Sequence, residues 1–234
     1  MENLNTTKEI TAFSARAHQG GKKIAFVPTM GALHEGHLAL MREARKHGDV
    51  VVVSIFVNPK QFNDPKDFEK YTRDLEGDLR KCEGAGVDVV FTPSVDEMYP
   101  PDDASPALPL PKVAQPLEGK FRPGHFEGVV AVVSRLFRMI QPDAALFGLK
   151  DYQQVRVIEE MVKSQKSKVK IVRHPTIREK DGLAMSSRNV RLSAEGRQKA
   201  LLISKALKAA EYLYQKGERN PETLRQKIEQ GLTK

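Results

Sequence analysis

The sequence has few of the features that mark secreted, membrane-bound or disulfide-stabilised proteins. Cys82 is the only cysteine among 234 residues, so an internal disulfide is impossible. No apolar run approaches the roughly 20 residues that a membrane-spanning helix needs. Residues 1–4 lack the basic and then apolar pattern with which a signal peptide begins. We therefore expect a cytoplasmic globular protein that has no membrane partner.

Three common catalytic signatures are also missing. The chain contains no Walker-type phosphate loop, no Gly-x-Gly-x-x-Gly dinucleotide motif and no Gly-x-Ser-x-Gly nucleophile elbow. Tryptophan is absent, and no basic stripe is interleaved with aromatic residues as in single-strand nucleic-acid binders. Any phosphate chemistry must therefore depend on a different set of residues.

The chain carries a formal net charge of +8, which is compatible with nucleic acid or with small anionic substrates. Its basic residues are mostly interleaved with acidic ones, and the most one-sided cluster, 163–170, is typical of a solvated turn. We therefore predict no nucleic-acid partner. A non-enzymatic nucleic-acid binder remains an alternative that rests on the charge alone.

Short apolar segments alternate with amphipathic helical patterns along the first three quarters of the chain. Strands are predicted at 24–27, 50–57, 87–91, 143–149 and 169–172, and helical patterns at 7–18, 38–47, 67–83, 129–140 and 152–162. This alternation predicts an α/β fold, a Rossmann-like doubly wound parallel sheet with helices on both faces.

The pattern changes twice outside this alternation. Residues 93–124 are rich in proline, and a connection of that length is more often functional or mobile than a mere spacer. After residue 176 a Gly182 turn and a small polar segment lead into helices at 193–216 and from 221 onward. We predict a main domain over 1–176 and a small α+β domain over 177–234.

Residues 28–37 are the most informative stretch. An apolar strand stops at Pro28, glycine turns follow, and His34 and His37 stand at the start of an amphipathic helix. The start of a helix presents unpaired N–H groups and a positive dipole end, so it attracts anions such as phosphate. A zinc-binding pair and a purely structural capping pair are the alternatives for the two histidines.

Polar residues also follow two other predicted strands, at 58–61 and at 150–151. Because ligands bind beyond the carboxyl ends of parallel strands, these loops are expected to converge with 28–37 on one crevice. Lys150 alone is compatible with an ordinary exposed lysine, and residues 186–188 alone with a solvated loop. Together the two histidines, the lysine, two serines and an arginine form a clamp suited to polyphosphate.

Five motifs, taken in order, resemble one family. His34–His37 and Met185–Arg188 are similar to the two signature elements of nucleotidylyltransferases and class I aminoacyl-tRNA synthetases. More closely, the chain resembles pantoate–β-alanine ligases over about 26–189. The matching segments are 28–37 (PTMGALHEGH), 56–62 (FVNPKQF), 121–126 (FRPGHF), 147–154 (FGLKDYQQ) and 185–189 (MSSRN).

The resemblance implies a two-step reaction. The carboxylate of pantoate attacks the α-phosphorus of ATP to give pantoyl adenylate and pyrophosphate, and the amine of β-alanine then displaces AMP to give pantothenate. It also implies ATP as substrate, Mg²⁺ and a homodimer, although the apolar strand at 50–57 is equally explained as core.

The resemblance also assigns roles to particular residues. Gln61 and Gln154 would bind pantoate, and Asp78 is matched to a residue near Mg²⁺. The catalytic residues would be His34, His37, Lys150, Ser186, Ser187 and Arg188, and these six would bind ATP together with Met30, Gly148, Asp151, Ile177 and Met185.

Two matters stay open at this point. A different nucleotidylyltransferase of the same fold, one that makes a dinucleotide, is the second enzymatic alternative, although paired glutamines suit a polyhydroxy acid better than a phosphorylated acceptor. Family members usually continue beyond a helix such as 193–216 into a small sheet-containing domain, and this chain ends at Lys234. We therefore expect an incomplete lid, and we expect binding to survive better than turnover.

Overall fold

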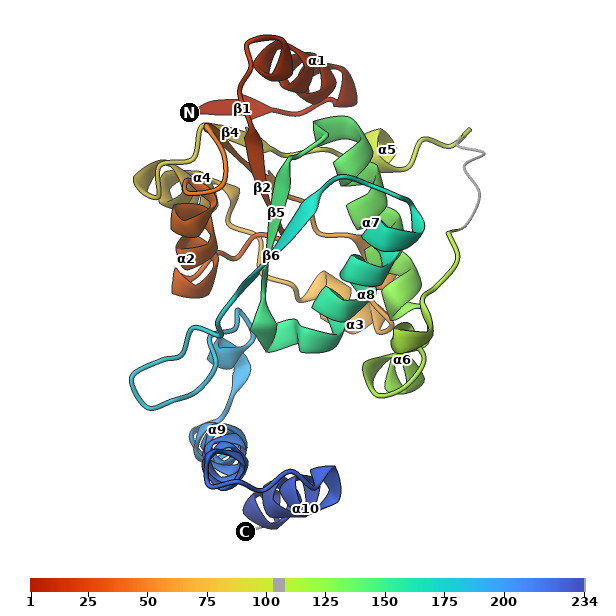
Figure 1. Cartoon of the computed structure of the whole chain (residues 1–234). Coiled ribbons are helices and arrows are strands. Elements are labelled where there is room, and N and C mark those ends of the chain that lie inside the picture. The colour runs from red at the N-terminus through yellow and green to blue at the C-terminus, as the bar shows by residue number, and fades with distance from the viewer. Residues whose placement is uncertain (103–107, 234) are drawn as a thin grey trace. The chain divides into compact units, whose positions relative to one another are not determined.

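The computed structural model describes residues 1–102 and 108–233 and has the predicted α/β architecture (Figure 1). In the described part of the chain the strands form one six-stranded sheet, all of it parallel, in the order β1-β4-β3-β2-β5-β6. The strands are β1 (Glu2–Leu4), β2 (Ile24–Thr29), β3 (Val50–Ile55), β4 (Val89–Phe91), β5 (Ala144–Gly148) and β6 (Lys170–His174).

Helices connect the strands and continue beyond the last one. The α-helices are α1 (Thr7–Gln19), α2 (Glu35–Ala44), α3 (Pro65–Glu69), α4 (Leu75–Gly84), α5 (Val95–Met98), α6 (Glu118–Phe121), α7 (His125–Ile140), α8 (Tyr152–Ser164), α9 (Ala194–Gln215) and α10 (Pro221–Leu232). Short 3₁₀ turns are η1 (Pro59–Gln61), η2 (Lys112–Ala114), η3 (Leu149–Asp151) and η4 (Asn189–Arg191).

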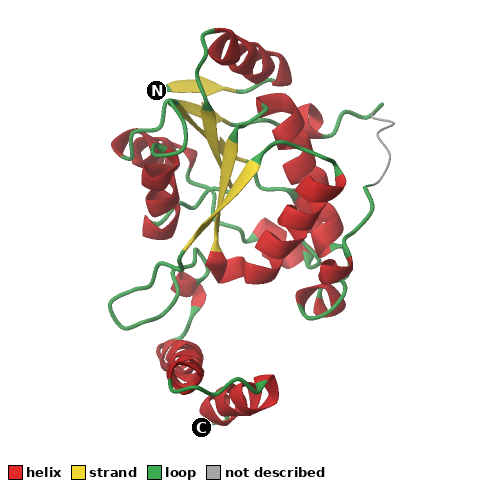
Figure 2. Cartoon of the chain, viewed as in Figure 1, coloured by secondary structure: helices red, strands yellow, loops and turns green. Residues whose placement is uncertain are grey.

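Helices lie on both faces of the sheet (Figure 2), and a hydrophobic cluster packs against each face. Side chains of α1, α7 and α8, such as Ile10 and Ile158, pack with Phe26 of β2 on one face. Side chains of α2 and α4, Met41 and Cys82 among them, pack with the alternate β2 residue Val27 on the other. Successive residues of a strand point to opposite faces, so a strand covered on both sides is predominantly apolar, as β2 and β3 are.

The strand order brings three loops together. β2 lies between β3 and β5, so the segments that follow these strands leave the sheet side by side at its carboxyl edge. The chain proceeds outward from β2 through β3 to β4 on one side and from β5 to β6 on the other. Parallel sheets bind ligands at such a switch point, and the convergence predicted for residues after 28, 58 and 148 follows from it.

The local differences from the sequence predictions have simple causes. β1 was not predicted because it is a three-residue edge strand with the sequence Glu-Asn-Leu, which has no apolar run. The helix predicted over 67–83 is two helices, because Asp64 and Asp74 each cap a separate helix start through their side chains. α2 begins earlier than the predicted 38, at Glu35. The proline-rich connection contains α5, η2 and α6, whereas Pro106 lies outside the described residues.

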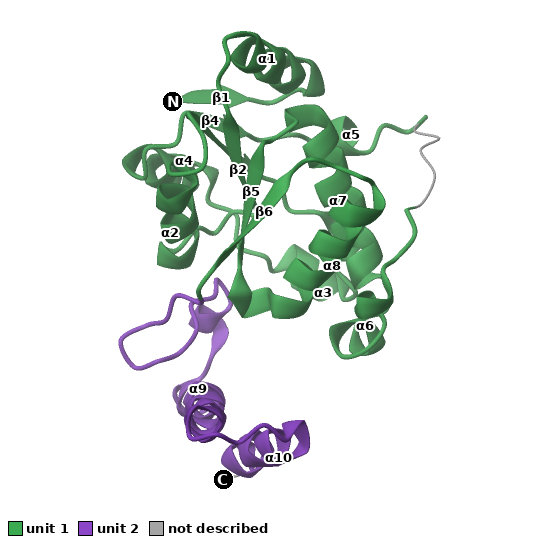
Figure 3. Cartoon of the chain, viewed as in Figure 1, with its two compact units in different colours: residues 1–175 green, residues 176–234 purple. Residues whose placement is uncertain are grey.

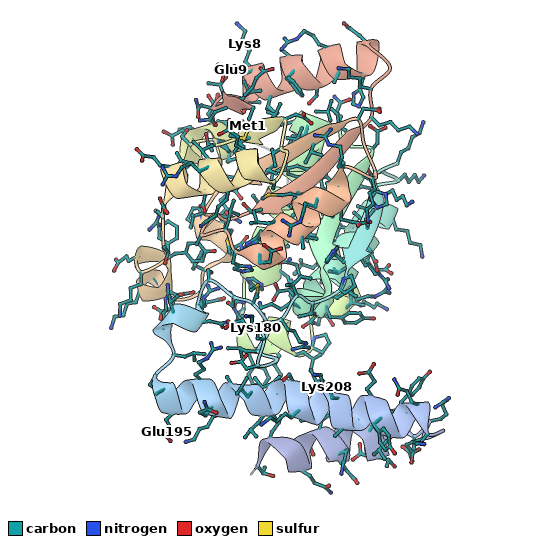
Figure 4. All side chains as sticks on the ribbon, turned by 90° about the vertical axis from the view of Figure 1, so that its left-hand side faces the viewer. Met1, Lys8, Glu9, Lys180, Glu195 and Lys208 are labelled. Carbon is teal, nitrogen blue, oxygen red and sulfur yellow. The ribbon has the colours of Figure 1, made fainter. Side chains whose placement is uncertain are left out.

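The chain divides into two compact units, Met1–Pro175 and Thr176–Lys234, one residue from the predicted boundary (Figure 3). In the second unit α9 and α10 run beside each other (Figure 4). A Cβ on Gly231 of α10 would lie 2.7 Å from the Cβ of Ala206, so glycine permits this close contact. None of the helices in the described ranges is long and apolar enough to cross a membrane.

Candidate active site

The loop after β2 has an unusual backbone that one buried carboxylate holds in place. Gly31 and Ala32 both adopt positive φ values, +77° and +49°, and the second is uncommon for a residue with a Cβ. Asp78 of α4, whose exposed fraction is 1%, accepts hydrogen bonds from the backbone N–H groups of Ala32 and Leu33, both at 2.8 Å. The carboxylate thereby fixes the direction in which the chain enters α2.

His34 and His37 cap the start of α2 in a reciprocal arrangement. Nδ1 of His34 accepts from the N–H of Gly36 at 3.2 Å, and Nδ1 of His37 accepts from the N–H of His34 at 3.2 Å. Because both Nδ1 atoms accept hydrogen bonds, each neutral ring carries its proton on Nε2. The two histidines do cap the helix, as one alternative held, and the proton of each ring lies on Nε2.

The pair is partly buried, and its rings lie 4.1 Å apart between centroids. Burial lowers the pKa of His37 to about 3, and the charges of His34, Lys150 and Lys81 act in the same direction. His37 is therefore neutral at pH 7. Lys150 of η3 and Lys81 of α4, two cations from separate elements, both act on the charge of this imidazole.

Lys150 and Asp151 belong to η3, directly after β5. Nζ of Lys150 lies 3.1 Å from Oδ1 of Asp151, and both side chains are substantially exposed, so the pair is weak and the lysine can exchange it for an anionic ligand. Gly148 ends β5, and a Cβ there would meet no neighbouring atom within 4 Å. The backbone at this position is therefore open to a ligand.

Lys81 was not singled out in the sequence. Its Nζ donates to the backbone oxygen of Leu33 at 2.9 Å and lies 3.7 Å from Asp78, and its side chain is partly exposed. It stands three residues after Asp78 on α4, so the two project from the same helix face. This spacing was the one feature of the sequence that could have pointed to Lys81. It becomes informative only when α4 is known to contact the loop after β2.

Gln61 lies at the end of η1, in the loop after β3. Its Oε1 accepts from Nδ2 of Asn58 at 3.1 Å, and its Nε2 lies 2.9 Å from the Sδ of Met30. The structure thus brings Gln61 and Met30 together from neighbouring loops. The backbone oxygen of Gln61 accepts from Nδ1 of the buried His125 at 3.0 Å, a contact across 64 residues that no local pattern could have revealed.

Gln154 lies in the first turn of α8, a few residues after Lys150, and is partly buried. Its neighbour Gln153 has a different task, because Nε2 of Gln153 donates to the backbone oxygens of Val113 and Pro116 and so fastens the proline-rich connection. Among the described residues no hydrogen bond to the side chain of Gln154 is formed, so its amide is available to a ligand.

The second unit contains the remaining predicted residues. The N–H of Met185 donates to the backbone oxygen of Ile177 at 3.0 Å, which closes a short hairpin whose antiparallel bridge joins Arg178 to Ala184. The hydroxyl of Ser186 accepts from the N–H of Arg188 at 3.2 Å. Residues 177 and 185–188 are thus adjacent in space.

Helix α9 and the polar segment hold this hairpin together. Arg197 of α9 contacts the carboxylates of Glu179 and Asp181, each at 2.6 Å. The side chain of Asn189 donates to Glu179 at 2.8 Å and to the backbone oxygen of Ala184 at 3.0 Å. The turn at Gly182, where φ is +97°, is therefore anchored at its base.

A metal ion would find few protein ligands here. No cluster of three or more His, Cys, Asp or Glu side chains suited to a metal occurs in residues 1–102 and 108–233. Each oxygen of Asp78 accepts one backbone hydrogen bond and keeps a further lone pair. This donor set fits Mg²⁺, which commonly uses one carboxylate together with water and phosphate oxygens. It does not resemble a zinc site.

A helix start with two imidazoles and two lysines, at the switch point of a parallel sheet, is typical of α/β proteins that bind a nucleotide phosphate or a similar anion. Comparison with known proteins gives the particular family. The family model for pantoate-beta-alanine ligase matches residues 2–234, and the chain belongs to this family.

Individual relatives agree with this assignment. The chain is 54% identical over 212 residues to pantothenate synthetase of Thermoanaerobacter sp. (strain X514), a match that covers 91% of this chain and 75% of the relative. Its structure matches that of pantothenate synthetase from Thermus thermophilus with a TM-score of 0.91 and 45% identity, over 100% of this chain and 82% of the other.

A third relative was solved with ligands. The pantoate-beta-alanine ligase from Francisella tularensis, described as complexed with beta-gamma ATP and beta-alanine, matches with a TM-score of 0.83 and 38% identity over 99% of this chain and 86% of the other. Family membership makes the chain a ligase of pantothenate biosynthesis. The family's reaction is the ATP-dependent joining of pantoate and β-alanine through pantoyl adenylate.

Proposed function

We propose that this chain catalyses that reaction with the residues gathered at the carboxyl ends of β2, β3 and β5. The observation that carries the proposal is the reciprocal capping of α2, because it presents two imidazole N–H donors where the helix dipole already favours an anion. The donors are held before substrate arrives, which is the condition for efficient stabilisation of developing charge.

In the first step the carboxylate of pantoate attacks the α-phosphorus of ATP. A carboxylate with a pKa near 4 is already ionised at neutral pH and needs no general base. The obstacle is repulsion between this carboxylate and the triphosphate. His34, His37 and Lys150 reduce this repulsion by binding phosphate oxygens. The same groups stabilise the negative charge that moves onto the departing pyrophosphate.

Lys81 adds a second cation in this proposal. Its Nζ is anchored on Leu33, so the charge remains beside the phosphate-binding loop without a flexible search. The neutral state of His37 matters too, because a neutral imidazole donates one N–H without adding a third fixed charge to the site. Met30 follows β2, and Gly148 and Asp151 lie at and just after the end of β5; these three residues are proposed to contact ATP.

Pantoate is proposed to bind between Gln61 and Gln154. Amide side chains suit a substrate with hydroxyl and carboxylate groups, and neither adds charge next to the reacting carboxylate. In the second step the amine of β-alanine attacks the acyl carbon of the adenylate, and AMP leaves. The site contributes mainly by holding amine and adenylate together, since no residue is required as a base if the amine binds unprotonated.

Residues of the second unit are proposed to bind ATP as well, on the basis of the family resemblance. Ser186, Ser187 and Arg188 offer two hydroxyls and a guanidinium for phosphate oxygens, and Ile177 and Met185 would contact the nucleotide. The glycine turn at 182 suits a segment that acts as a lid. Mg²⁺, when bound with ATP beside Asp78, would neutralise part of the triphosphate charge.

The reaction is tested by measuring AMP and pyrophosphate release from ATP with the purified chain. Release must depend on pantoate, and AMP formation with pantothenate as product must depend on β-alanine as well. AMP release without any requirement for pantoate would contradict the proposal. A dinucleotide formed from ATP and a phosphorylated acceptor would favour a different nucleotidylyltransferase of the same fold. Steeply salt-dependent RNA binding without affinity for ATP would favour a non-enzymatic nucleic-acid binder.

Two further properties are proposed from the family alone. We expect a homodimer, which light scattering would detect as twice the 26.2 kDa mass of one chain. The apolar strand β3 is buried in the centre of the sheet and supplies no argument for an interface. We also expect the protein in the cytoplasm, where ATP is available and the thiol of Cys82 stays reduced.

A further inference from the structure

A chain of three polar side chains lies behind the proposed pantoate site. Oη of Tyr99, which follows α5, donates to Oδ1 of Asn58 at 3.0 Å. Nδ2 of Asn58 then donates to Oε1 of Gln61 at 3.1 Å. Asn58 is 1% exposed and Gln61 is 9% exposed, so water does not compete freely for these contacts.

The orientation of the Asn58 amide is determined by two backbone groups that have only one role each. The N–H of Lys60 can only donate, and it faces Oδ1 at 3.2 Å. The C=O of Gly128 can only accept, and it faces Nδ2 at 3.0 Å. Oδ1 is therefore an acceptor, the tyrosine hydroxyl must be its donor, and Nδ2 must donate to Gln61.

This direction determines what Gln61 can offer a ligand. Its Oε1 faces Asn58, so Nε2 is fixed at the opposite end of the amide, where one hydrogen is directed to Sδ of Met30 and the second remains for substrate. The hydrogen-bond network thus rules out the flipped amide, and the Nε2 end of Gln61 is a donor. It can bind an ionised carboxylate or a hydroxyl oxygen, and it disfavours a ligand that presents a donor at the same point.

The ring of Tyr99 is held independently of its hydroxyl. It lies 6.2 Å from the ring of Phe56 between centroids, and Nζ of Lys60 lies 3.9 Å from its centroid. Removal of the hydroxyl therefore leaves the ring in its packing environment. This separation makes the role of the hydroxyl accessible to a single conservative substitution.

We propose that Tyr99 is a positioning residue that acts through Asn58 to orient Gln61 as a hydrogen-bond donor, and so selects an oxygen acceptor on the acid substrate. This inference rests on the proposed binding of pantoate at Gln61. It assigns to Tyr99 no contact with substrate.

The test measures the dissociation constants of pantoate and ATP separately by calorimetry on the full chain. Tyr99→Phe should weaken pantoate binding about five-fold and leave ATP binding unchanged, because one buried hydrogen bond is lost. Asn58→Asp should weaken pantoate binding more, by about a hundred-fold, because a carboxylate oxygen would face the oxygens of Gln61 and Gly128. Tyr212→Phe on α9 is the matched control, since that tyrosine is 58% exposed, and should change neither constant.

A double-mutant cycle separates positioning from packing. If Tyr99 acts through Gln61, then Tyr99→Phe should have no further effect on pantoate binding in a Gln61→Ala background. The same loss in both backgrounds, or an equal loss for ATP and pantoate, would overturn the proposal. Wild-type chain that binds no pantoate would overturn the proposed function as well, whereas wild-type binding that Tyr99→Phe leaves unchanged would overturn only the role of Tyr99.

Discussion

The buried carboxylate of Asp78 should decide whether the loop between β2 and α2 adopts its observed backbone conformation. The informative change is Asp78→Asn, which keeps the size of the side chain and removes its charge. The amide oxygen can still accept from one of the N–H groups of Ala32 and Leu33, but the amide NH₂ must face the other. A donor then opposes a donor in a position that is 1% exposed.

The expected cost follows from these contacts. Loss of one charge-assisted hydrogen bond together with an unsatisfied buried N–H corresponds to about 3 kcal/mol of unfolding free energy. The positive φ of Ala32 adds to the effect, because a strained backbone persists only while its surroundings hold it. Against a typical stability of about 5–15 kcal/mol, this loss is large but leaves a folded population to study.

The assay is urea unfolding followed by circular dichroism, with ATP affinity measured in parallel. Asp74→Asn is the matched control, because it makes the same chemical change at the start of the same helix. Asp74 is exposed and accepts from the N–H of Gly77 at 3.0 Å, and asparagine serves equally well at such a cap, so the expected change is near zero. If Asp78→Asn weakened ATP binding but left stability within about 0.5 kcal/mol of wild type, the structural role would be refuted and a role at Mg²⁺ alone would remain.

Three further predictions concern neighbouring parts of the site. Lys150→Ala should reduce pyrophosphate release by about a hundred-fold or more with little change in melting temperature, because the side chain is exposed; an equal loss of stability would identify a structural residue. The pKa of His37 is about 3 when folded and about 6.5 when unfolded, so this residue's contribution to stability is complete above pH 6.5 and falls by about 1.4 kcal/mol per pH unit as the pH drops toward 3. Urea titrations at pH 7 and pH 5 should show a smaller difference in His37→Gln than in wild type, and an identical difference would contradict the assignment. Gly128→Ala would place a Cβ 2.4 Å from the backbone oxygen of Lys60, so we expect a loss of about 2–4 kcal/mol in unfolding experiments and weaker pantoate binding, whereas Gly84→Ala, where a Cβ meets nothing within 4 Å, should be tolerated.

The fold was largely predictable because its signals are local. An apolar segment such as Val50–Ile55 must be covered on both faces, and its alternation with amphipathic helices leaves few arrangements other than a parallel sheet. The sequence predictions of secondary structure were wrong where the local preference for strand or helix was weak. β1 carries polar residues at an edge, and the break between α3 and α4 depends on capping by Asp74, which a helical period does not reveal.

The candidate site was predictable in its residue types but not in its atoms. His34 and His37 were predicted to stand at a helix start, and the structure confirms that they do. Their tautomers depend on which backbone N–H each Nδ1 meets. The pKa of His37 depends first on its burial and then on the charges of His34 and of Lys150, which follows a different strand. Gln61 was expected to donate and accept together, and only the contact with Asn58 decides which end of its amide is the oxygen.

The sequence by itself determined the alternation of strands and helices that gives a parallel α/β sheet, the family, and the set of polar residues proposed to bind ATP and pantoate. These follow from side-chain chemistry and from short-range spacing, both of which can be read directly from the sequence. Only the tertiary structure decided which atoms those residues can offer. Asp78 meets Leu33 across 45 residues, and Tyr99 meets Asn58 across 41. Such contacts set proton positions and amide orientations, and they arise only when separate loops pack at the edge of one sheet.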